Sequence, residues 1–267
     1  MINKVKKYLV IGNPIEHSLS PKLHNYWIKK NNINAVYDKK KLDDVDLKNI
    51  ISEIKEETIS GINVTVPFKK SIITFLDELS PEANETQSVN TIYLKNGNII
   101  GHNTDIEGFE LGLRHCKYDV KDKKVFVLGG GGVVSSIIYS LNKMKASKII
   151  ISNRTKKKAE DLKNSFKYID VVKWGEVPNF DMIINATSIG LKNEDKIKFD
   201  YSSVGPDKFF YDVIYNPKET IFLKRAKLFG NRTENGKMMF IYQALRSFNI
   251  WHKIIPLIDE SVIKLLD

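Results

Sequence analysis

A run of four glycines directly after an apolar strand is the feature that most constrains this chain. Residues 125–128 read Val-Phe-Val-Leu, four glycines follow, and a helix-like pattern resumes at Val133. In an α/β unit this order predicts a strand, a tight turn that a phosphate can approach, and a helix N-terminus. The pattern therefore predicts a dinucleotide site whose first residues are Gly129, Gly130, Gly131, Gly132 and Val133.

The end of the next predicted strand indicates which dinucleotide is bound. Such units often carry an acidic residue there for the ribose 2′-hydroxyl, yet residues 147–159 contain no acid. Arg154, between Asn153 and Thr155, occupies that place instead. Because a guanidinium binds a phosphate through paired hydrogen bonds, the sequence predicts NADP rather than NAD.

The length of 267 residues fits two domains, each large enough to bury its own core. We expect the α/β class, with a cleft between two α/β domains. The glycine turn lies in residues 103–235, which are predicted to form a Rossmann-like NADP-binding domain. Residues 1–102 are predicted to form a substrate-binding catalytic domain, onto which residues 236–267 fold back.

Strand-like and helix-like patterns alternate along the first hundred residues. The alternation favours a largely parallel sheet with helices on its faces. An Asn-Gly pair at 96–97 predicts a hairpin over 91–101. We expect strands at 8–13, 35–40 and 61–66 and helices at 21–31, 46–57, 69–79 and 104–115, then strands near 124–128, 148–152, 168–173, 181–185 and 208–212.

Charge and composition narrow the classes of protein. The formal net charge is +10, most of it in residues 103–235, where an anionic dinucleotide is expected. We find no nucleic-acid motif, no membrane-spanning run and no export signal, so we expect a cytoplasmic protein that binds neither nucleic acid nor membrane. One cysteine and five histidines without metal-ligand spacing predict no metal.

Two serines near the N-terminus are candidates for holding a carboxylate. Ser18 and Ser20 flank one residue, so an extended backbone would point both hydroxyls to one side. Pro21 suits a first helical position, which makes Ser20 the expected N-cap and adds a helix N-terminus to the anion site. The alternative is that Ser20 only caps the helix and Ser18 is solvated.

A dense polar segment follows at 63–69. Asn63 and Thr65 share one face of a predicted strand, and Lys69 falls in the first turn of the predicted helix 69–79. The helix dipole there disfavours a cation, so Lys69 is a candidate proton donor and acceptor. An ordinary surface lysine is the alternative.

Two further polar residues flank the predicted hairpin. Asp105 lies near the expected domain boundary and offers the carboxylate that a catalytic lysine needs as a partner. Asn90 lies just before the hairpin, and we expect its amide to point toward a hydroxylated ligand. The alternative for Asp105 is a routine acidic residue in the first turn of a helix. The alternative for Asn90 is a residue that only stabilises the turn before the hairpin.

Taken together, these segments resemble the shikimate dehydrogenase family along nearly the whole chain. The matching stretches are Gly12-Asn13-Pro14, His17-Ser18-Leu19-Ser20-Pro21, Asn63-Val64-Thr65-Val66-Pro67-Phe68-Lys69, Val89-Asn90-Thr91, Asn103-Thr104-Asp105, the glycine turn, Asn153-Arg154-Thr155, Asn185-Ala186-Thr187-Ser188, Asp212-Val213-Ile214-Tyr215-Asn216-Pro217, and Gly236 with Gln243.

The resemblance implies reversible, NADPH-dependent reduction of 3-dehydroshikimate to shikimate, in the pathway to aromatic amino acids. It implies that Lys69 and Asp105 are the catalytic pair. Substrate-binding residues would be Ser18, Ser20, Asn63, Thr65, Asn90, Asp105, Tyr215 and Gln243. Cofactor contacts would include the glycine turn, Val133, Asn153, Arg154, Thr155, Lys158, Thr187, Val213 and Gly236.

Three alternatives remain open at this point. An enzyme of the same family could accept quinate or prefer NAD, although Arg154 and the absent acid argue against NAD. A catalytically idle NADP-binding sensor would not need both Lys69 and Asp105. The third alternative, a basic nucleic-acid-binding protein, would have to stay bound to DNA at moderate salt. A homodimer is compatible with the sequence.

Overall fold

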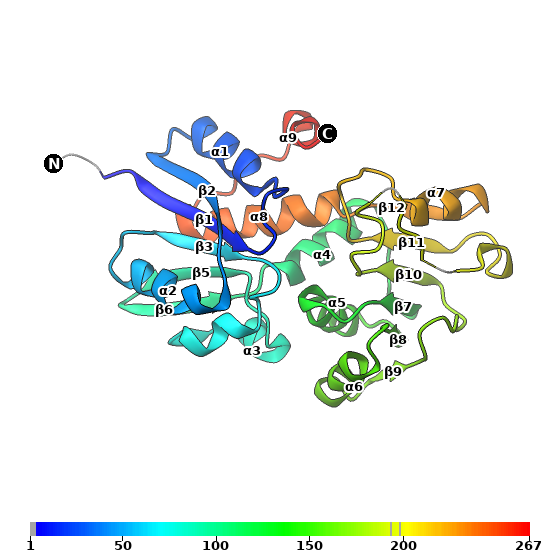
Figure 1. Ribbon diagram of the computed structural model, residues 1–267. Helices are drawn as coiled ribbons and strands as arrows, with labels where there is room; N and C mark the ends of the chain where they lie inside the picture. The colour runs from blue at the N-terminus through cyan, green and yellow to red at the C-terminus, as the bar shows by residue number, and fades with distance from the viewer. Residues whose placement is uncertain (1–3, 193, 198) are drawn as a thin grey trace. The chain divides into compact units, whose positions relative to one another are not determined.

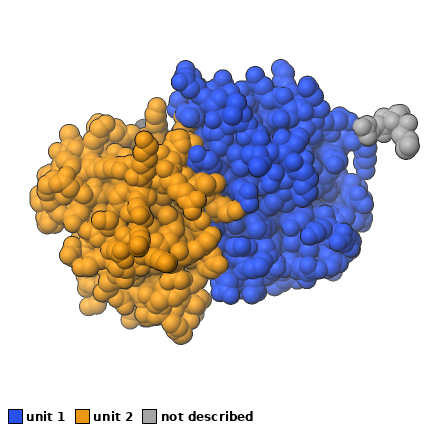
Figure 2. Space-filling view, turned by 180° about the vertical axis from the view of Figure 1, so that it is seen from behind, with its two compact units in different colours: residues 1–106, 241–267 blue, residues 107–240 orange. Residues whose placement is uncertain are grey.

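The chain forms two compact units, each with its own six-stranded sheet. The computed structural model describes residues 4–192, 194–197 and 199–267. Unit 1 contains residues 1–106 and 241–267, and unit 2 contains residues 107–240; Figure 2 colours them separately. The expected boundaries at 102/103 and 235/236 lie a few residues earlier, because two continuous helices carry the chain from one unit to the other.

The sheet of unit 1 has the order β2-β1-β3-β5-β6-β4 (Figure 1). Strand β1 pairs parallel with β2 and β3, whereas β5 pairs antiparallel with β3 and with β6. The expectation of a largely parallel sheet holds for three of the five strand pairings, β4 pairing parallel with β6 as well, and the 96–97 turn sets β5 antiparallel to both of its neighbours. The strands are β1 Lys6–Gly12, β2 Ala35–Lys41, β3 Gly61–Val64, β4 Glu78–Leu79, β5 Thr91–Lys95 and β6 Asn98–His102.

Helix α2 covers one face of this sheet. Its Leu47, Ile50, Ile51 and Ile54 recur at helical spacing and pack with β1 and β3 residues in one core. The helices assigned wholly or partly to unit 1 are α1 Ser20–Lys30, α2 Leu47–Lys55, α3 Pro81–Thr86, α4 Asp105–His115, α8 Lys237–His252 and α9 Glu260–Leu265, with a 3₁₀ turn η1 at Asp44–Asp46.

The helix expected over 69–79 does not form. Residues 66–70 make a turn, residues 71–75 make one 3₁₀ segment (η2, Ser71–Phe75), and the strand β4 follows. β-branched Ile72, Ile73 and Thr74 favour a helix weakly. The Asp77 carboxylate also accepts the backbone N–H of Ile99 at 2.7 Å, which holds this segment beside β6.

The sheet of unit 2 is parallel throughout, in the order β12-β11-β10-β7-β8-β9. Its strands are β7 Lys124–Leu128, β8 Lys148–Ser152, β9 Ile169–Val171, β10 Met182–Asn185, β11 Phe209–Asp212 and β12 Arg232–Glu234. Its further helices are α5 Gly132–Lys143, α6 Lys156–Ser165 and α7 Ile221–Leu228, with a 3₁₀ turn η3 at Tyr201–Ser203.

Two cores lie on opposite faces of this sheet. Helices α5 and α6 lie on one face of the sheet and α7 lies on the other (Figure 1). Val125 and Val127 of β7 pack in the core with α5 and α6, whereas Phe126 and Leu128 pack in the core with α7, as the two-residue period of a strand requires. Burial on both faces explains why these strands read as continuous apolar runs. All six strands end at one edge, where ligands of parallel sheets bind.

A buried histidine in unit 1 makes the stability of the protein sensitive to acid. The His24 ring stacks on Tyr37 with a centroid distance of 4.2 Å and an interplanar angle of 7°. Neither ring nitrogen has a hydrogen-bond partner among the described residues. Burial, assisted by His252, lowers the pKa of His24 from 6.5 to about 3. The folded state therefore holds the neutral imidazole.

We expect this histidine to destabilise the fold as the pH falls from 6.5 toward 3. Unfolded His24 takes up a proton in that window and folded His24 does not. The free energy of unfolding should lose up to about 1.4 kcal/mol per pH unit from this group. In the variant His24→Phe that loss should disappear, since phenylalanine keeps the stack without titrating.

Urea unfolding at several pH values measures this effect. The difference between wild type and variant isolates His24, because other titrating groups cancel. At neutral pH we expect the two stabilities to agree within about 1.5 kcal/mol. An equally steep acid loss in His24→Phe would contradict the assignment.

Candidate active site

Unit 1 contains a buried ion pair between a lysine and an aspartate. Lys69 lies in the turn after β3, and Asp105 is the first residue of α4. The Lys69 Nζ is hydrogen-bonded to Asp105 Oδ2, with side chains 11% and 7% exposed. Since no helix begins at Lys69, the helix dipole invoked from the sequence does not act on it. The carboxylate is the group that orients this ammonium.

The second oxygen of Asp105 is held by an amide. Asn90 Nδ2 donates to Asp105 Oδ1 at 2.9 Å, and Asn90 Oδ1 accepts the backbone N–H of Thr104 at 2.8 Å. Asn90 is 2% exposed. Both oxygens of Asp105 are thus engaged, which fixes the carboxylate plane and the direction of the Lys69 ammonium.

Helix α8 brings one expected and one missed residue to this cluster. Gln243 Oε1 lies 3.5 Å from Asn90 Nδ2. Ser247, one turn further, is fully buried and lies 2.8 Å from Thr91 Oγ1 and 2.9 Å from Asn63 Nδ2. The four-residue spacing from Gln243 is the sequence signal that could have identified Ser247.

Asn63 is occupied by protein partners on both ends of its amide. Its Oδ1 accepts the Tyr37 hydroxyl at 2.6 Å, and its Nδ2 donates to the Asn90 carbonyl oxygen at 2.9 Å. Tyr37 also hydrogen-bonds the side chain of Ser20, and burial raises its pKa well above 10. Tyr37 is a second residue missed from the sequence, and it connects the serine pair with the amide cluster.

The serine pair differs from expectation in its backbone. Leu19 is helical, with φ −89° and ψ −1°, so Ser18 and Ser20 do not follow strand geometry. Helix α1 begins at Ser20 itself, its N-cap is Leu19, and the cap residue makes no side-chain bond. Ser20 as N-cap is therefore wrong, because Pro21 follows as the second helical residue. The Ser18 hydroxyl instead accepts the Ser20 N–H at 3.3 Å.

Thr65 lies just beyond β3. Its backbone N–H donates to the Ile11 carbonyl oxygen at 2.9 Å. The side chain is half-buried beside Gly12, where an added Cβ would lie 2.5 Å from the Thr65 methyl carbon. Gly12 therefore leaves room for Thr65 in the same unit that holds Lys69 and Asp105.

In unit 2 the glycine turn follows β7 at the carboxyl edge of the sheet. Gly129 has φ +132°, and a Cβ there would lie 2.6 Å from the Ala186 carbonyl oxygen, so the turn requires glycine. A Cβ on Gly131 would meet nothing within 4 Å. Gly132 begins α5, whose N-cap Gly131 offers no side chain. Val133 and Val134 pack into the core beneath. An open backbone turn at a helix N-terminus suits a pyrophosphate.

The residues expected around the adenosine end lie beside this turn. A Cβ on Gly130 would lie 3.0 Å from Asn153 Cγ and 3.2 Å from Lys158 Cβ. Arg154 is exposed in the connection from β8 to α6, as is Thr155. The turn therefore has cationic side chains beside it, and these residues fit a phosphorylated dinucleotide.

The remaining predicted residues of unit 2 lie at the ends of β10 and β11. Thr187 follows β10, Val213 follows β11, and the Gly236 N–H donates to the Ile214 carbonyl oxygen at 3.1 Å. A Cβ on Gly236 would lie 2.0 Å from the Val213 carbonyl oxygen. Tyr215 is half-buried and stacks on Phe240 with a centroid distance of 4.4 Å.

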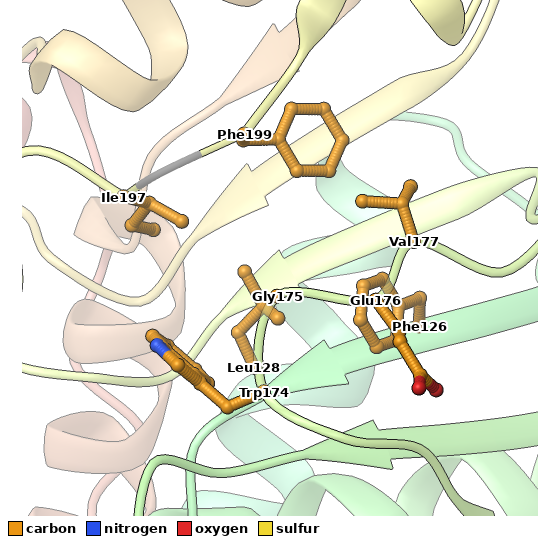
Figure 3. Close-up of a pocket in the computed structure, with 8 residues that line it drawn as sticks. All are labelled: Phe126, Leu128, Trp174, Gly175, Glu176, Val177, Ile197 and Phe199. Carbon is orange, nitrogen blue, oxygen red and sulfur yellow. The ribbon is translucent and has the colours of Figure 1, made fainter.

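Unit 2 also contains an apolar hollow, which reaches Leu128, the residue before the glycine turn. It is lined by Phe126, Leu128, Trp174, Gly175, Glu176, Val177, Ile197 and Phe199 (Figure 3). None of the predicted site residues lines it. In the described part of the chain, no helix is long and apolar enough to cross a bilayer. Among the same residues, no three His, Cys, Asp or Glu side chains gather as metal ligands would.

Comparison with known families matches both units. Residues 10–92 match the family model described as shikimate dehydrogenase substrate binding domain. Residues 110–194 match the model described as shikimate / quinate 5-dehydrogenase. Together the two matches cover more than half of the chain.

Individual relatives match over the full length. A shikimate dehydrogenase (NADP(+)) of Pelagibacter ubique is 62% identical over 262 residues, which covers 98% of this chain and 99% of the relative. The crystal structure of shikimate dehydrogenase from Aquifex aeolicus has a TM-score of 0.91 at 39% identity and covers 100% and 99% of the two chains. A shikimate dehydrogenase solved in complex with NADP+ has a TM-score of 0.92 at 35% identity, with 100% and 96% covered.

Proposed function

The chain belongs to the shikimate dehydrogenase family, and from this we propose that unit 1 binds the substrate and unit 2 binds NADP. The protein is an NADP-dependent oxidoreductase that acts on a CH–OH group. It interconverts shikimate and 3-dehydroshikimate, which places it in the synthesis of aromatic amino acids. This function also accounts for the open glycine turn and the exposed Arg154 of unit 2.

The observation that carries the catalytic assignment is the Lys69–Asp105 ion pair. A lysine with only 11% of its side chain exposed, held by a carboxylate that Asn90 also orients, is equipped to transfer a proton. In the direction of reduction, the Lys69 ammonium donates a proton to the oxygen that was the ketone. In the reverse direction, neutral Lys69 removes the hydroxyl proton. Asp105 stays ionised and keeps the ammonium aimed.

NADPH, when bound, supplies the hydride for the ketone carbon. The glycine turn and Val133 would hold its pyrophosphate, with Asn153, Arg154, Thr155 and Lys158 at the adenosine 2′-phosphate. Thr187, Val213 and Gly236 would hold its nicotinamide end. Positive charge and backbone N–H groups are the partners that such an anion needs.

For the substrate, we assign the carboxylate to Ser18 and Ser20. Its hydroxyls and reacting oxygen are assigned to Thr65, Asn90, Asp105, Tyr215 and Gln243. Asn63 contributes through Asn90, whose carbonyl oxygen it binds at 2.9 Å. We also propose a cytoplasmic location, in keeping with the single cysteine, and a homodimer, which light scattering would test.

The initial rate of cofactor reduction tests this function. The purified protein is assayed with shikimate or quinate, each paired with NADP+ or NAD+. We expect a rate confined largely to shikimate with NADP+. Comparable rates with quinate or NAD+ would move the protein to the broader-specificity branch of the family. NADP+ binding without any rate would favour the idle sensor.

A further inference from the structure

A buried carboxyl group in unit 2 has no part in the chemistry above. Asp212, the last residue of β11, is fully buried. Its Oδ1 accepts Asn185 Nδ2 and the Ile214 N–H, both at 3.0 Å. Its Oδ2 accepts the Thr220 hydroxyl at 2.6 Å. Burial raises its pKa to about 6, and at neutral pH the three donors hold the carboxylate.

The hydrogen bonds of Asp212 lead in two directions. The first, through Asn185 and Ile214, reaches residues expected at the cofactor, and we call it the cofactor arm. Asn185 Oδ1 accepts the backbone N–H of Thr187 at 3.1 Å and its hydroxyl at 2.7 Å. The Asn185 carbonyl oxygen accepts the Val213 N–H at 2.9 Å, and the Ile214 carbonyl oxygen accepts the Gly236 N–H at 3.1 Å. Asp212 binds Asn185, which holds Thr187 and Val213. Asp212 also binds Ile214, which holds Gly236, so its carboxylate connects all three segments.

The other arm leads away from them. Thr220 is the N-cap of α7, where its hydroxyl oxygen accepts the Leu223 N–H at 3.4 Å. Helix α7 packs through Phe222, Leu223 and Ala226 in the core that also contains Phe126 and Leu128 of β7. The bonds of Asp212 to Asn185 and Ile214 therefore lead toward the cofactor residues, whereas its bond to Thr220 leads only to the packing of α7.

Strand order indicates which part of the cofactor the first arm meets. The glycine turn follows β7, and Arg154 follows β8 on one side of it. Strands β10 and β11 lie on the other side of β7. With the pyrophosphate at the turn and the 2′-phosphate at Arg154, the nicotinamide half must extend over the ends of β10 and β11.

We propose that Asp212 is a positioning residue for the nicotinamide half of NADP, acting through Asn185 and the backbone of Ile214. This inference rests on the proposed function. The charged oxygen fixes the direction of the Asn185 amide, and the amide in turn fixes Thr187. A neutral residue at 212 holds the Asn185 amide and the Ile214 N–H less firmly, so the Thr187 and Gly236 segments are positioned less well, while the backbone bond from Val213 to Asn185 remains.

The test compares two ligands that differ only in the nicotinamide. NADP+ and 2′-phospho-ADP-ribose are titrated into wild type and Asp212→Asn by calorimetry, and the emission of bound NADPH is recorded. We expect Asp212→Asn to weaken NADP+ about tenfold and 2′-phospho-ADP-ribose less than about twofold. The NADPH emission maximum should move toward that of the free cofactor.

Leu223→Ala is the matched control. It leaves every donor to Asp212 in place and removes packing of α7 from the core, so it should lower the melting temperature while both affinities stay within about twofold. Asn185→Ser removes the bonds from the Asn185 amide to Asp212, Thr187 and the Ile189 carbonyl oxygen and leaves the Thr220 bond in place. It should reproduce the Asp212→Asn pattern, and it serves as the test if Asp212→Asn does not fold.

Two results would overturn the proposal. One is an equal weakening of both ligands in the Asp212→Asn and Asn185→Ser variants. The other is wild-type affinity together with wild-type NADPH emission in these variants. A wild-type protein that binds neither ligand would instead refute the NADP function itself.

Discussion

Replacing Lys69 with alanine should lower kcat about a thousandfold and leave the dissociation constant of shikimate within a few-fold of wild type. Transfer of a proton by a positioned side chain contributes about 10²–10⁴-fold to a rate. In the proposed mechanism the Lys69 ammonium is the proton source, whereas the substrate carboxylate is assigned to Ser18 and Ser20. Steady-state rates at saturating shikimate and NADP+, with shikimate binding by calorimetry, measure the two quantities separately.

Lys70→Ala is the matched control. Lys70 is the exposed neighbour of Lys69 and takes the same substitution, so its kcat should stay within about twofold of wild type. Because Lys69→Ala leaves Asp105 without its cation, circular dichroism should first establish that the variant is folded. Weaker shikimate binding at unchanged kcat would show that Lys69 only contacts the substrate.

The sequence predicted those candidate site residues that lie within one short motif. The motif at 63–69 and the motif at 103–105 each supply one member of the ion pair, and chain topology brings them together. The glycine turn between β7 and α5, and the place of Arg154 after β8, were predictable for the same reason, since strand, turn and helix are contiguous. Pairing between distant segments was not predictable from such motifs, so Tyr37, Ser247 and Asp212 received no role.

The wrong predictions have a common physical origin. The helix expected at 69–79 and the N-cap expected at Ser20 both came from local propensity alone. At 69–79 a contact with a distant strand prevailed, because the Ile99 N–H holds the Asp77 carboxylate. At the start of α1 the first helical residue is Ser20 rather than Pro21, so the cap position falls on Leu19.

The second large effect concerns the choice of cofactor. The variant Arg154→Asp should weaken NADP+ binding about a hundredfold, while NAD+ affinity stays within a few-fold of wild type. If Arg154 binds the 2′-phosphate as proposed, the variant loses a charge-assisted hydrogen bond and gains repulsion from a carboxylate. NAD+ has a 2′-hydroxyl at that position, to which an aspartate can bond. Calorimetric titration of both cofactors measures the two affinities.

Lys167→Asp separates this contact from a general change of charge. Lys167 is exposed beyond the end of α6 in the same unit, and the substitution changes the net charge by the same amount as Arg154→Asp. Long-range attraction of an anion would weaken NADP+ in both variants and would fade with salt, because charges separated by more than about 10 Å are screened at 0.1 M. A direct contact affects Arg154→Asp alone. Equal losses of NADP+ and NAD+ affinity in Arg154→Asp would show that the arginine maintains the fold of the turn between β8 and α6 rather than recognising the 2′-phosphate.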